Sequence, residues 1–237
     1  MRINHNISAL NTYRQLSFNN TQTAKNLEKL SSGYRINRAG DDAAGLAISE
    51  KMRGQIRGLE MAAKNSQDAI SLIQTAEGAL TETHAILQRM RELAVQGAND
   101  TNTTADRDNI QDELNQLLSE IDRIANTTEF NTKKLLNGGF SATFQVGAND
   151  NQIITLSINT MNASSLTISS ISVGSNSLAS QAIASIDSAI SAVSKERSKL
   201  GAYQNRLEHT INNLGTSAEN LTAAESRIRD VDYALVA

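Results

Sequence analysis

The sequence contains no proline, no cysteine and no tryptophan, and it has only four phenylalanines and four tyrosines among its 237 residues. Proline breaks helices because it lacks a backbone donor and clashes with the preceding turn, so its absence removes the commonest cause of kinks. Without cysteine the chain can form no disulfide framework and perform no thiol chemistry. The scarcity of aromatic side chains argues against a large globular core and against an aromatic-lined ligand pocket.

Excess charge and long apolar runs are also lacking. The formal net charge is -3, which counts against nucleic acid as a partner. No segment approaches the roughly 18 consecutive apolar residues of a membrane span. The first residues contain no apolar run of signal-peptide length. We therefore expect no membrane insertion and, if the protein leaves the cell, export without a cleaved signal peptide.

The region from Ile183 to Ile228 carries the clearest pattern, a three-four spacing of apolar residues sustained over successive heptads. The apolar stripe of so long a helix can be buried only against another long helix. The pattern therefore predicts a coiled coil, in which this stripe forms the seam between the helices, and a rod-shaped protein. Arg197, Gln204 and Glu225 interrupt the stripe, either as tolerated polar positions or, as we favour, as residues that select the register. The seam positions are Ile190, Val193, Leu200, Leu207, Ile211, Leu214, Leu221 and Ile228.

A second long helix is predicted from about residue 42 to residue 96. Asp41 and Asp42 can cap its start or pair with Arg35 or Arg38, and Gly97 stands where a C-terminal glycine belongs. The predicted core positions of this helix, at three-four spacing, are Ser49, Met52, Ile56, Leu59, Ala63, Ser66, Ile70, Ile73, Glu77, Leu80, His84, Leu87, Arg91 and Ala94. A third helix, starting near residue 103 or 104, is indicated by Ile110, Leu114, Leu117, Ile121 and Ile124.

The remaining segments complete the expected fold. Residues 140–146 and 154–158 alternate in polarity around a turn, which predicts a β-hairpin. Residues 160–180 are rich in serine and asparagine, and we expect a short extended or loosely ordered insert. The predicted class is mainly α, with long antiparallel helices forming a coiled-coil rod and a small hairpin region between them. A weakly amphipathic helix over residues 3–34 is indicated by Ile3, Ile7, Leu10, Tyr13, Leu16, Leu27, Leu30 and Tyr34.

No constellation of residues predicts catalysis or metal binding. His5, His84 and His209 are far apart and lack a metal-ligand spacing. Glu208 and His209 are neighbours, but adjacent side chains on a helix point in different directions. The chain has no glycine-rich phosphate loop and no nucleophile-base pair. We expect no catalytic residue, no metal and no cofactor, and hence no enzyme.

Several blocks of the sequence resemble bacterial flagellins, and they follow one another in the same order over nearly the whole chain. These blocks are Lys29–Gly33, Arg35–Ile48, Ser71–Leu80, Gln88–Ala94, Leu200–Leu207 and Glu225–Asp230. The resemblance implies a structural subunit of the bacterial flagellar filament, exported unfolded to the cell exterior and polymerised with other flagellin subunits for motility. An export chaperone and a filament cap are the further partners that it implies.

The resemblance also implies a division of the chain. Residues 1–43 would hold the N-terminal inner-tube helix and a connection, and residues 44–159 the outer-tube domain with two helices and the hairpin. Residues 160–180 would be a short insert in place of the variable outer domains, and residues 181–237 the heptad helix of the outer-tube domain. This arrangement corresponds to a minimal flagellin.

The resembling flagellins continue beyond the position of Asp230–Asp232 with a further apolar helix that pairs with the N-terminal helix. The sequence in hand ends at Ala237, so we expect residues 1 to about 40 of a monomer to be largely disordered or held by a neighbouring molecule. By the same reasoning, we expect the chain as written not to form stable filaments alone, although it could join filaments of a full-length relative.

Arg89, Leu93 and Glu113 match positions at which flagellins contact the mammalian flagellin-sensing Toll-like receptor. Arg89 and Leu93 are four residues apart and share a helix face. The alternative is that the same residues serve packing between subunits, and both roles can hold. For the whole chain, two alternatives to a filament subunit are a hook-filament junction protein and a non-polymerising helical adaptor.

Overall fold

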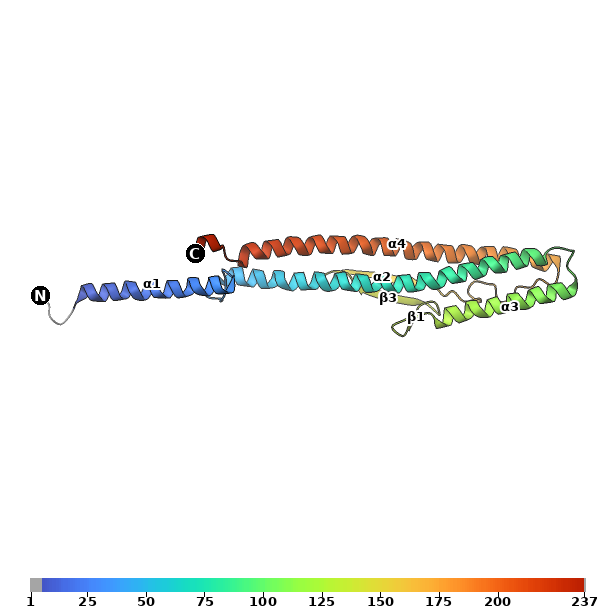
Figure 1. Cartoon of the computed structure of the whole chain (residues 1–237). Helices are drawn as coiled ribbons and strands as arrows, with labels where there is room; N and C mark the ends of the chain where they lie inside the picture. The colour runs from blue at the N-terminus through green and yellow to red at the C-terminus, as the bar shows by residue number, and fades with distance from the viewer. Residues whose placement is uncertain (1–5, 237) are drawn as a thin grey trace. The chain divides into compact units, whose positions relative to one another are not determined.

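The computed structural model describes residues 6–236, and most of them are helical (Figure 1). The long helices in chain order are α1 (Ile7–Ser32), α2 (Ala43–Gly97), α3 (Thr104–Thr127) and α4 (Asn176–Arg229). Between α3 and α4 lie β1 (Glu129–Phe130), β2 (Lys133–Lys134), β3 (Phe140–Gln145) and β4 (Ile153–Ile158), and a short α5 (Tyr233–Val236) follows α4. The predicted class, mainly α with a small β region, is confirmed.

The chain divides into two compact units, and the division cuts through both α2 and α4. One unit contains the chain up to Glu60 together with the chain from Gly215 onward, and the other runs from Met61 to Leu214. The sequence suggested boundaries near residues 43, 159 and 180, where a helix begins or the composition changes. Compactness depends on packing rather than on element ends, so one continuous helix can belong to two units.

The order of the N-terminal region in a monomer stays a prediction, but in the first unit α1 is a complete helix. Local signals account for it. The side chain of Asn6 caps the start by accepting the N–H of Ala9 at 3.1 Å. Gly33 ends the helix with a φ of 75°, a left-handed conformation that glycine adopts without steric penalty. The expected lack of a packing partner remains visible, since α1, described over its whole length, has no buried residue. Ile3 lies outside the described residues.

The adjacent carboxylates of Asp41 and Asp42 have different roles. Asp42 caps α2, its carboxylate accepting the N–H of Gly45 at 2.8 Å, as predicted. Asp41 instead accepts the backbone N–H groups of Arg38 and Asn37 at 3.0 and 3.2 Å. These two hydrogen bonds, that of Arg38 first, lower the pKa of Asp41 from its ordinary value.

The predicted side-chain pairing of Asp41 or Asp42 with Arg35 or Arg38 is wrong. The guanidinium of Arg38 pairs with Glu28 of α1 at 3.0 Å, and that of Arg35 donates to a backbone carbonyl at the end of α4. Sequence proximity suggested the pairing, but the backbone donors of the loop are nearer to Asp41 and have no other acceptor within it.

A short antiparallel bridge joins the segment after α1 to the end of α4 within the first unit. The N–H of Val231 donates to the carbonyl of Gly33 at 3.0 Å, and the N–H of Arg35 donates to the carbonyl of Arg229 at 2.7 Å. The guanidinium carbon of Arg229 lies 4.6 Å from the centre of the Tyr34 ring, a cation–π distance. The bridge therefore fixes both backbone and side chains at this junction.

In the second unit, α2 and α4 run antiparallel, as predicted. Arg91 of α2 pairs with Asp187 of α4 at 2.6 Å, and Glu77 of α2 lies 3.9 Å from Arg197 of α4. Residue numbers rise along one helix as they fall along the other. Buried apolar residues of α4 recur at the heptad interval over this stretch, and they are Ala179, Ile186, Val193, Leu200, Leu207 and Leu214.

The eight seam positions proposed from the sequence differ in burial. Four of them are buried: Val193, Leu200, Leu207 and Leu214. The other four are half-buried: Ile190, Ile211, Leu221 and Ile228. Ile190 lies at the margin of the seam because its neighbour Ala189 takes the buried position.

The polar residue inside the seam is Glu196, which is 3% exposed, and not its neighbour Arg197. The carboxylate of Glu196 accepts the backbone N–H and the side-chain amide of Asn159 at 3.2 and 3.0 Å. It also accepts the ammonium of Lys199 at 3.2 Å. Arg197 is only half-buried at the margin. Glu196 thus ties α4 to the residue after β4, whereas the register role proposed for Arg197, which lies 3.9 Å from Glu77 of α2, stays a prediction.

The buried face of α2 differs from the one predicted from the three-four spacing of its sequence. Every second predicted core position lies at the edge of the helix packing or in solvent, and these positions are Ile70, Glu77, His84 and Arg91. The residues one position earlier are buried instead: Ala69, Ala76, Thr83 and Met90. The physical reason is that α2 packs against α3 as well as against α4, which buries a wider stripe than a two-helix seam does.

The predicted β-hairpin is confirmed. Strands β3 and β4 pair antiparallel from Phe140 opposite Ile158 to Gln145 opposite Ile153. Alternate residues of β4 are buried, which places one face of the hairpin on the helices. A second, shorter hairpin of β1 and β2 was not predicted, and its turn residues Asn131 and Thr132 have positive φ values of 48° and 66°.

The segment between β4 and α4 is ordered, which corrects the expectation of a loosely ordered insert. Side chains of distant helices bind its backbone. Asp122 of α3 accepts the N–H of Ala163 at 2.8 Å, and Gln111 of α3 accepts the N–H of Val173 at 2.9 Å. Its apolar side chains are buried in the core, and they are Met161, Ala163, Leu166, Ile168 and Val173.

Gly97 ends α2, but not as a left-handed cap, since the left-handed glycines of the described chain are Gly33, Gly138 and Gly139. Close packing explains the glycine instead. A Cβ at position 97 would lie 3.0 Å from the Cβ of Val173, which is buried.

Leu207 provides a direct test of the α2–α4 packing. We expect Leu207→Asp to lower the free energy of unfolding by more than the burial of a leucine side chain, about 1.5–3 kcal/mol, because it also buries an unpaired charge. Thermal melts followed by circular dichroism measure the loss, at about 2–4 °C in Tm per kcal/mol. Leu178→Asp is the matched control, since Leu178 lies on the same helix and is exposed. Equal melting of the two variants would contradict the packing.

Candidate functional site

The structure offers no support for a catalytic reading of the histidines. His84 is half-buried and its Nδ1 is buried without a partner, while His209 is exposed on α4. His5 lies outside the described residues. Within residues 6–236, no three residues of the metal-ligating types gather closely enough to hold a metal ion. Among these residues, no helix is long and apolar enough to cross a membrane.

α1 presents apolar side chains to solvent around more than one side. At helical spacing, Ile7, Leu10 and Phe18 share one side, whereas Leu16 and Leu27 lie on another. Each of these residues is more than half exposed. A helix that is apolar on several sides is stable in water only when other chains cover it. α1 is therefore a candidate surface for contact with more than one neighbour.

Arg89 of α2 and Glu113 of α3 form an ion-pair bridge between the two helices. Arg89 Nε donates to Glu113 Oε1 at 3.0 Å, and a second guanidinium nitrogen lies 2.9 Å from the same oxygen. Arg89 also pairs with Glu92 at 3.2 Å. The hydrogen bond to Glu113 is the main cause that raises the pKa of Arg89 above its ordinary value, followed by that to Glu92. Both bridge residues remain about half exposed, which leaves them accessible to a partner.

Leu93 does not belong to this accessible surface. It is 2% exposed and is part of the apolar core of the second unit. The resemblance grouped Leu93 with Arg89 and Glu113, but the structure buries Leu93, and the contact role of the patch stays a prediction. Four-residue spacing places two side chains on the same helix face, but the neighbouring α3 covers the Leu93 part of that face. The exposed part of the predicted patch is the Arg89–Glu113 bridge.

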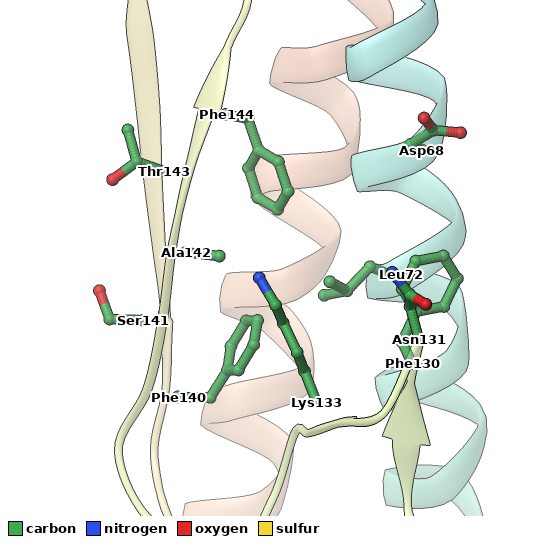
Figure 2. Close-up of a pocket in the computed structure, with 10 residues that line it drawn as sticks. All are labelled: Asp68, Leu72, Phe130, Asn131, Lys133, Phe140, Ser141, Ala142, Thr143 and Phe144. Atoms are coloured by element: carbon green, nitrogen blue, oxygen red, sulfur yellow. The ribbon is translucent and has the colours of Figure 1, made fainter.

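A groove lies between the hairpins and α2 in the second unit (Figure 2), with a volume of about 650 Å³. Phe140, Ala142 and Phe144 point from β3 toward the helices, while Ser141 and Thr143 point away (Figure 2). Its other lining residues are Asp68, Leu72, Phe130, Asn131 and Lys133.

Three of the four phenylalanines of the chain line this groove. Most phenylalanine side chains of the chain are thus concentrated at one place. The alternation of Phe140 and Phe144 on one face of β3 was the available signal, but nothing in the sequence placed Phe130 beside them.

Two family descriptions match the chain. The bacterial flagellin N-terminal helical region matches residues 3–141, and the bacterial flagellin C-terminal helical region matches residues 183–236. The flagellin of Bacillus subtilis strain 168 is 57% identical over 270 aligned residues, which cover 99% of this chain and 88% of that protein.

Solved structures give a similar result. A crystal structure of Bacillus cereus flagellin matches with a TM-score of 0.56 and 34% identity, covering 68% of this chain and 94% of that one. A Vibrio parahaemolyticus structure assigned as a flagellar hook-associated protein matches with a TM-score of 0.66, covering 80% of this chain and 100% of that one. Its identity is 14%, so it shows a shared fold alone.

The burial difference within the predicted patch leads to a prediction. We expect Leu93→Ala to lower the free energy of unfolding by about 2–5 kcal/mol, because it leaves a cavity in the core. Arg89→Ala and Glu113→Ala should leave Tm nearly unchanged, because exposed ion pairs contribute little to stability. Circular dichroism melts of the three variants make the comparison. A stable Leu93→Ala variant would place Leu93 outside the core.

Proposed function

The chain belongs to the bacterial flagellin family, and we propose on that premise that it is a structural subunit of the flagellar filament rather than an enzyme. The observation that carries this conclusion is the match to flagellin at 57% identity over 99% of the chain. A local motif could be shared by proteins of different function, but this match includes the helices, the hairpins and the segment between them.

The exposed apolar surface of α1 supports self-assembly as the function. A monomer that exposes Ile7, Leu10 and Phe18 on one side and Leu16 and Leu27 on another leaves apolar area in water. Burying such area is worth about 25 cal/mol per Å², and a repeated contact between copies buries it on every subunit. Contacts on more than one side suit a polymer, since a dimer would cover a single face.

The comparisons favour a filament subunit over the two alternatives. A hook-filament junction protein shares the fold, as the Vibrio parahaemolyticus structure illustrates, but at 14% identity the likeness carries no function. A free helical adaptor would not require extensive identity to filament proteins. The Bacillus subtilis and Bacillus cereus flagellins match at 57% and 34% identity.

The location and the remaining partners follow from the same proposal. A filament subunit lies outside the cell, where it contacts other subunits. An export chaperone and a cap at the growing end of the filament are the further partners that we propose. The absence of cysteine fits export in an unfolded state, because no disulfide can lock the chain before it leaves the cell.

Incorporation into filaments tests the assembly function. A tagged copy of the chain, produced in Bacillus subtilis beside its own flagellin, should be found along the filaments by immunogold electron microscopy. Leu10→Asp should abolish incorporation, since it places a charge on the exposed face of α1, while Tm stays unchanged because α1 has no buried residue. Asn19→Asp adds the same charge at an exposed polar position of α1 and should leave incorporation intact. Secreted chain that is absent from filaments would contradict the proposal.

We further propose that the Arg89–Glu113 bridge contacts the mammalian flagellin-sensing Toll-like receptor. Its exposure and its position on two helices of the second unit support this proposal. Charged residues in such a contact set orientation and rate of association.

Signalling assays in cells that express the receptor test the contact. Arg89→Ala and Glu113→Ala should each reduce the response at matched protein concentration. Arg123→Ala is the control, because Arg123 is also an exposed, ion-paired arginine, bound to Glu120 on α3. A response that is unchanged in both bridge variants, or reduced equally in the control, would rule the contact out.

A further inference from the structure

The chain contains one Asn-Gly dipeptide, Asn137–Gly138, and the structure places it in an exposed bend between β2 and β3. Asparagine is a thermolabile residue, and its stability in a protein depends on whether the next backbone nitrogen can reach its side-chain carbonyl carbon. Glycine is the most permissive following residue, because it has no Cβ and adopts conformations closed to other residues.

The local structure leaves both reacting groups free. Among the hydrogen bonds of the described residues, none involves the side chain of Asn137 or the N–H of Gly138. Gly138 has a φ of 134° and Gly139 a φ of 65°. A Cβ built at position 138 would meet no atom within 4 Å, so the space for a ring is open.

We propose that Asn137 is a site of spontaneous deamidation and isoaspartate formation. The backbone nitrogen of Gly138 attacks the side-chain carbonyl carbon of Asn137, forming a C–N bond. The bond from that carbon to the side-chain nitrogen breaks, and the nitrogen leaves as ammonia with the proton that Gly138 loses. The product is a five-membered succinimide. Water then adds to one of its two carbonyl groups and opens the ring, giving aspartate or isoaspartate at position 137.

Other asparagines lack this combination. Asn65 is followed by Ser66 within α2, and its side-chain amide donates to the carbonyl of Gln145 at 3.1 Å. Asn176 begins α4, and its side-chain amide donates to the carbonyl of Ala98. The N–H of Ser66 lies inside α2 and is held by the helix, and the side chains of both asparagines are held by their own hydrogen bonds.

The consequence is local and specific. Leu135 and Leu136 are fully buried, and the carbonyl of Leu136 accepts the N–H of Met161 at 3.1 Å. Phe140 is fixed opposite Ile158 in the hairpin. Isoaspartate inserts one methylene into the backbone between these two fixed points and adds a negative charge. The reaction therefore slowly changes the backbone that leads into β3.

Peptide mapping of the full chain tests the proposal. The protein is held in mildly alkaline and in mildly acidic buffer and then digested, and mass spectrometry measures conversion of each side-chain amide to a carboxyl group. Conversion should be several-fold greater at Asn137 than at any other asparagine. It should be faster in alkaline buffer, because loss of the Gly138 amide proton creates the nucleophile. An isoaspartyl methyltransferase should then label the same peptide.

The matched variant is Asn137→Gln, which keeps a side-chain amide and Gly138 but lengthens the ring that must form. This variant should lose most of the methyltransferase labelling, while conversion at Asn65 and Asn176 stays as low as in the parent chain. Retention of the Asn137 amide while other asparagines convert at the same rate would overturn the proposal. So would methyltransferase labelling that is equally strong in the Asn137→Gln variant.

Discussion

The antiparallel packing of α2 against α4 is the interaction on which the second unit depends. Buried residues of α4 recur at the heptad interval from Ala179 to Leu214, and the ion pairs Arg91–Asp187 and Glu77–Arg197 follow the same antiparallel order. Long helices that share one seam have many nearly equivalent registers. The two ion pairs are made in one of these registers, whereas the buried carboxylate of Glu196 binds Asn159 and Lys199 and so joins α4 to the residue after β4. The apolar stripe thus joins the two helices, and Glu196 joins α4 to the non-helical segment that follows β4.

The non-helical part of the second unit is held by a related device. Its backbone between β4 and α4 has no sheet partner, so its N–H groups need acceptors from elsewhere. Asp122, Gln111 and Glu196 supply them from the surfaces of α3 and α4. These side chains fix the segment while its leucine, isoleucine and valine side chains complete the core. Helix surfaces here act both as packing faces and as hydrogen-bond scaffolds.

The sequence allowed the helices, the main hairpin and the fold class to be predicted, because each depends on a periodicity within one segment. The errors concern contacts between segments. The order of residues 160–173 depends on acceptors that are distant in sequence, and the burial of Leu93 depends on α3 covering part of α2. The wide buried face of α2 reflects two neighbours, where the predicted core positions assumed one. The family resemblance selected the positions of Arg89 and Glu113, but it did not predict that their side chains form an ion pair.

The backbone bridge of the first unit has a kinetic consequence. Arg35 and Ile228, which it brings into contact, are separated by 193 positions in the chain. Contacts of such long range form slowly, because closure of a long loop must precede them. The second unit can therefore fold before the first. The junction between α1 and α4 becomes a late folding event, because its two segments must first meet across most of the length of the chain.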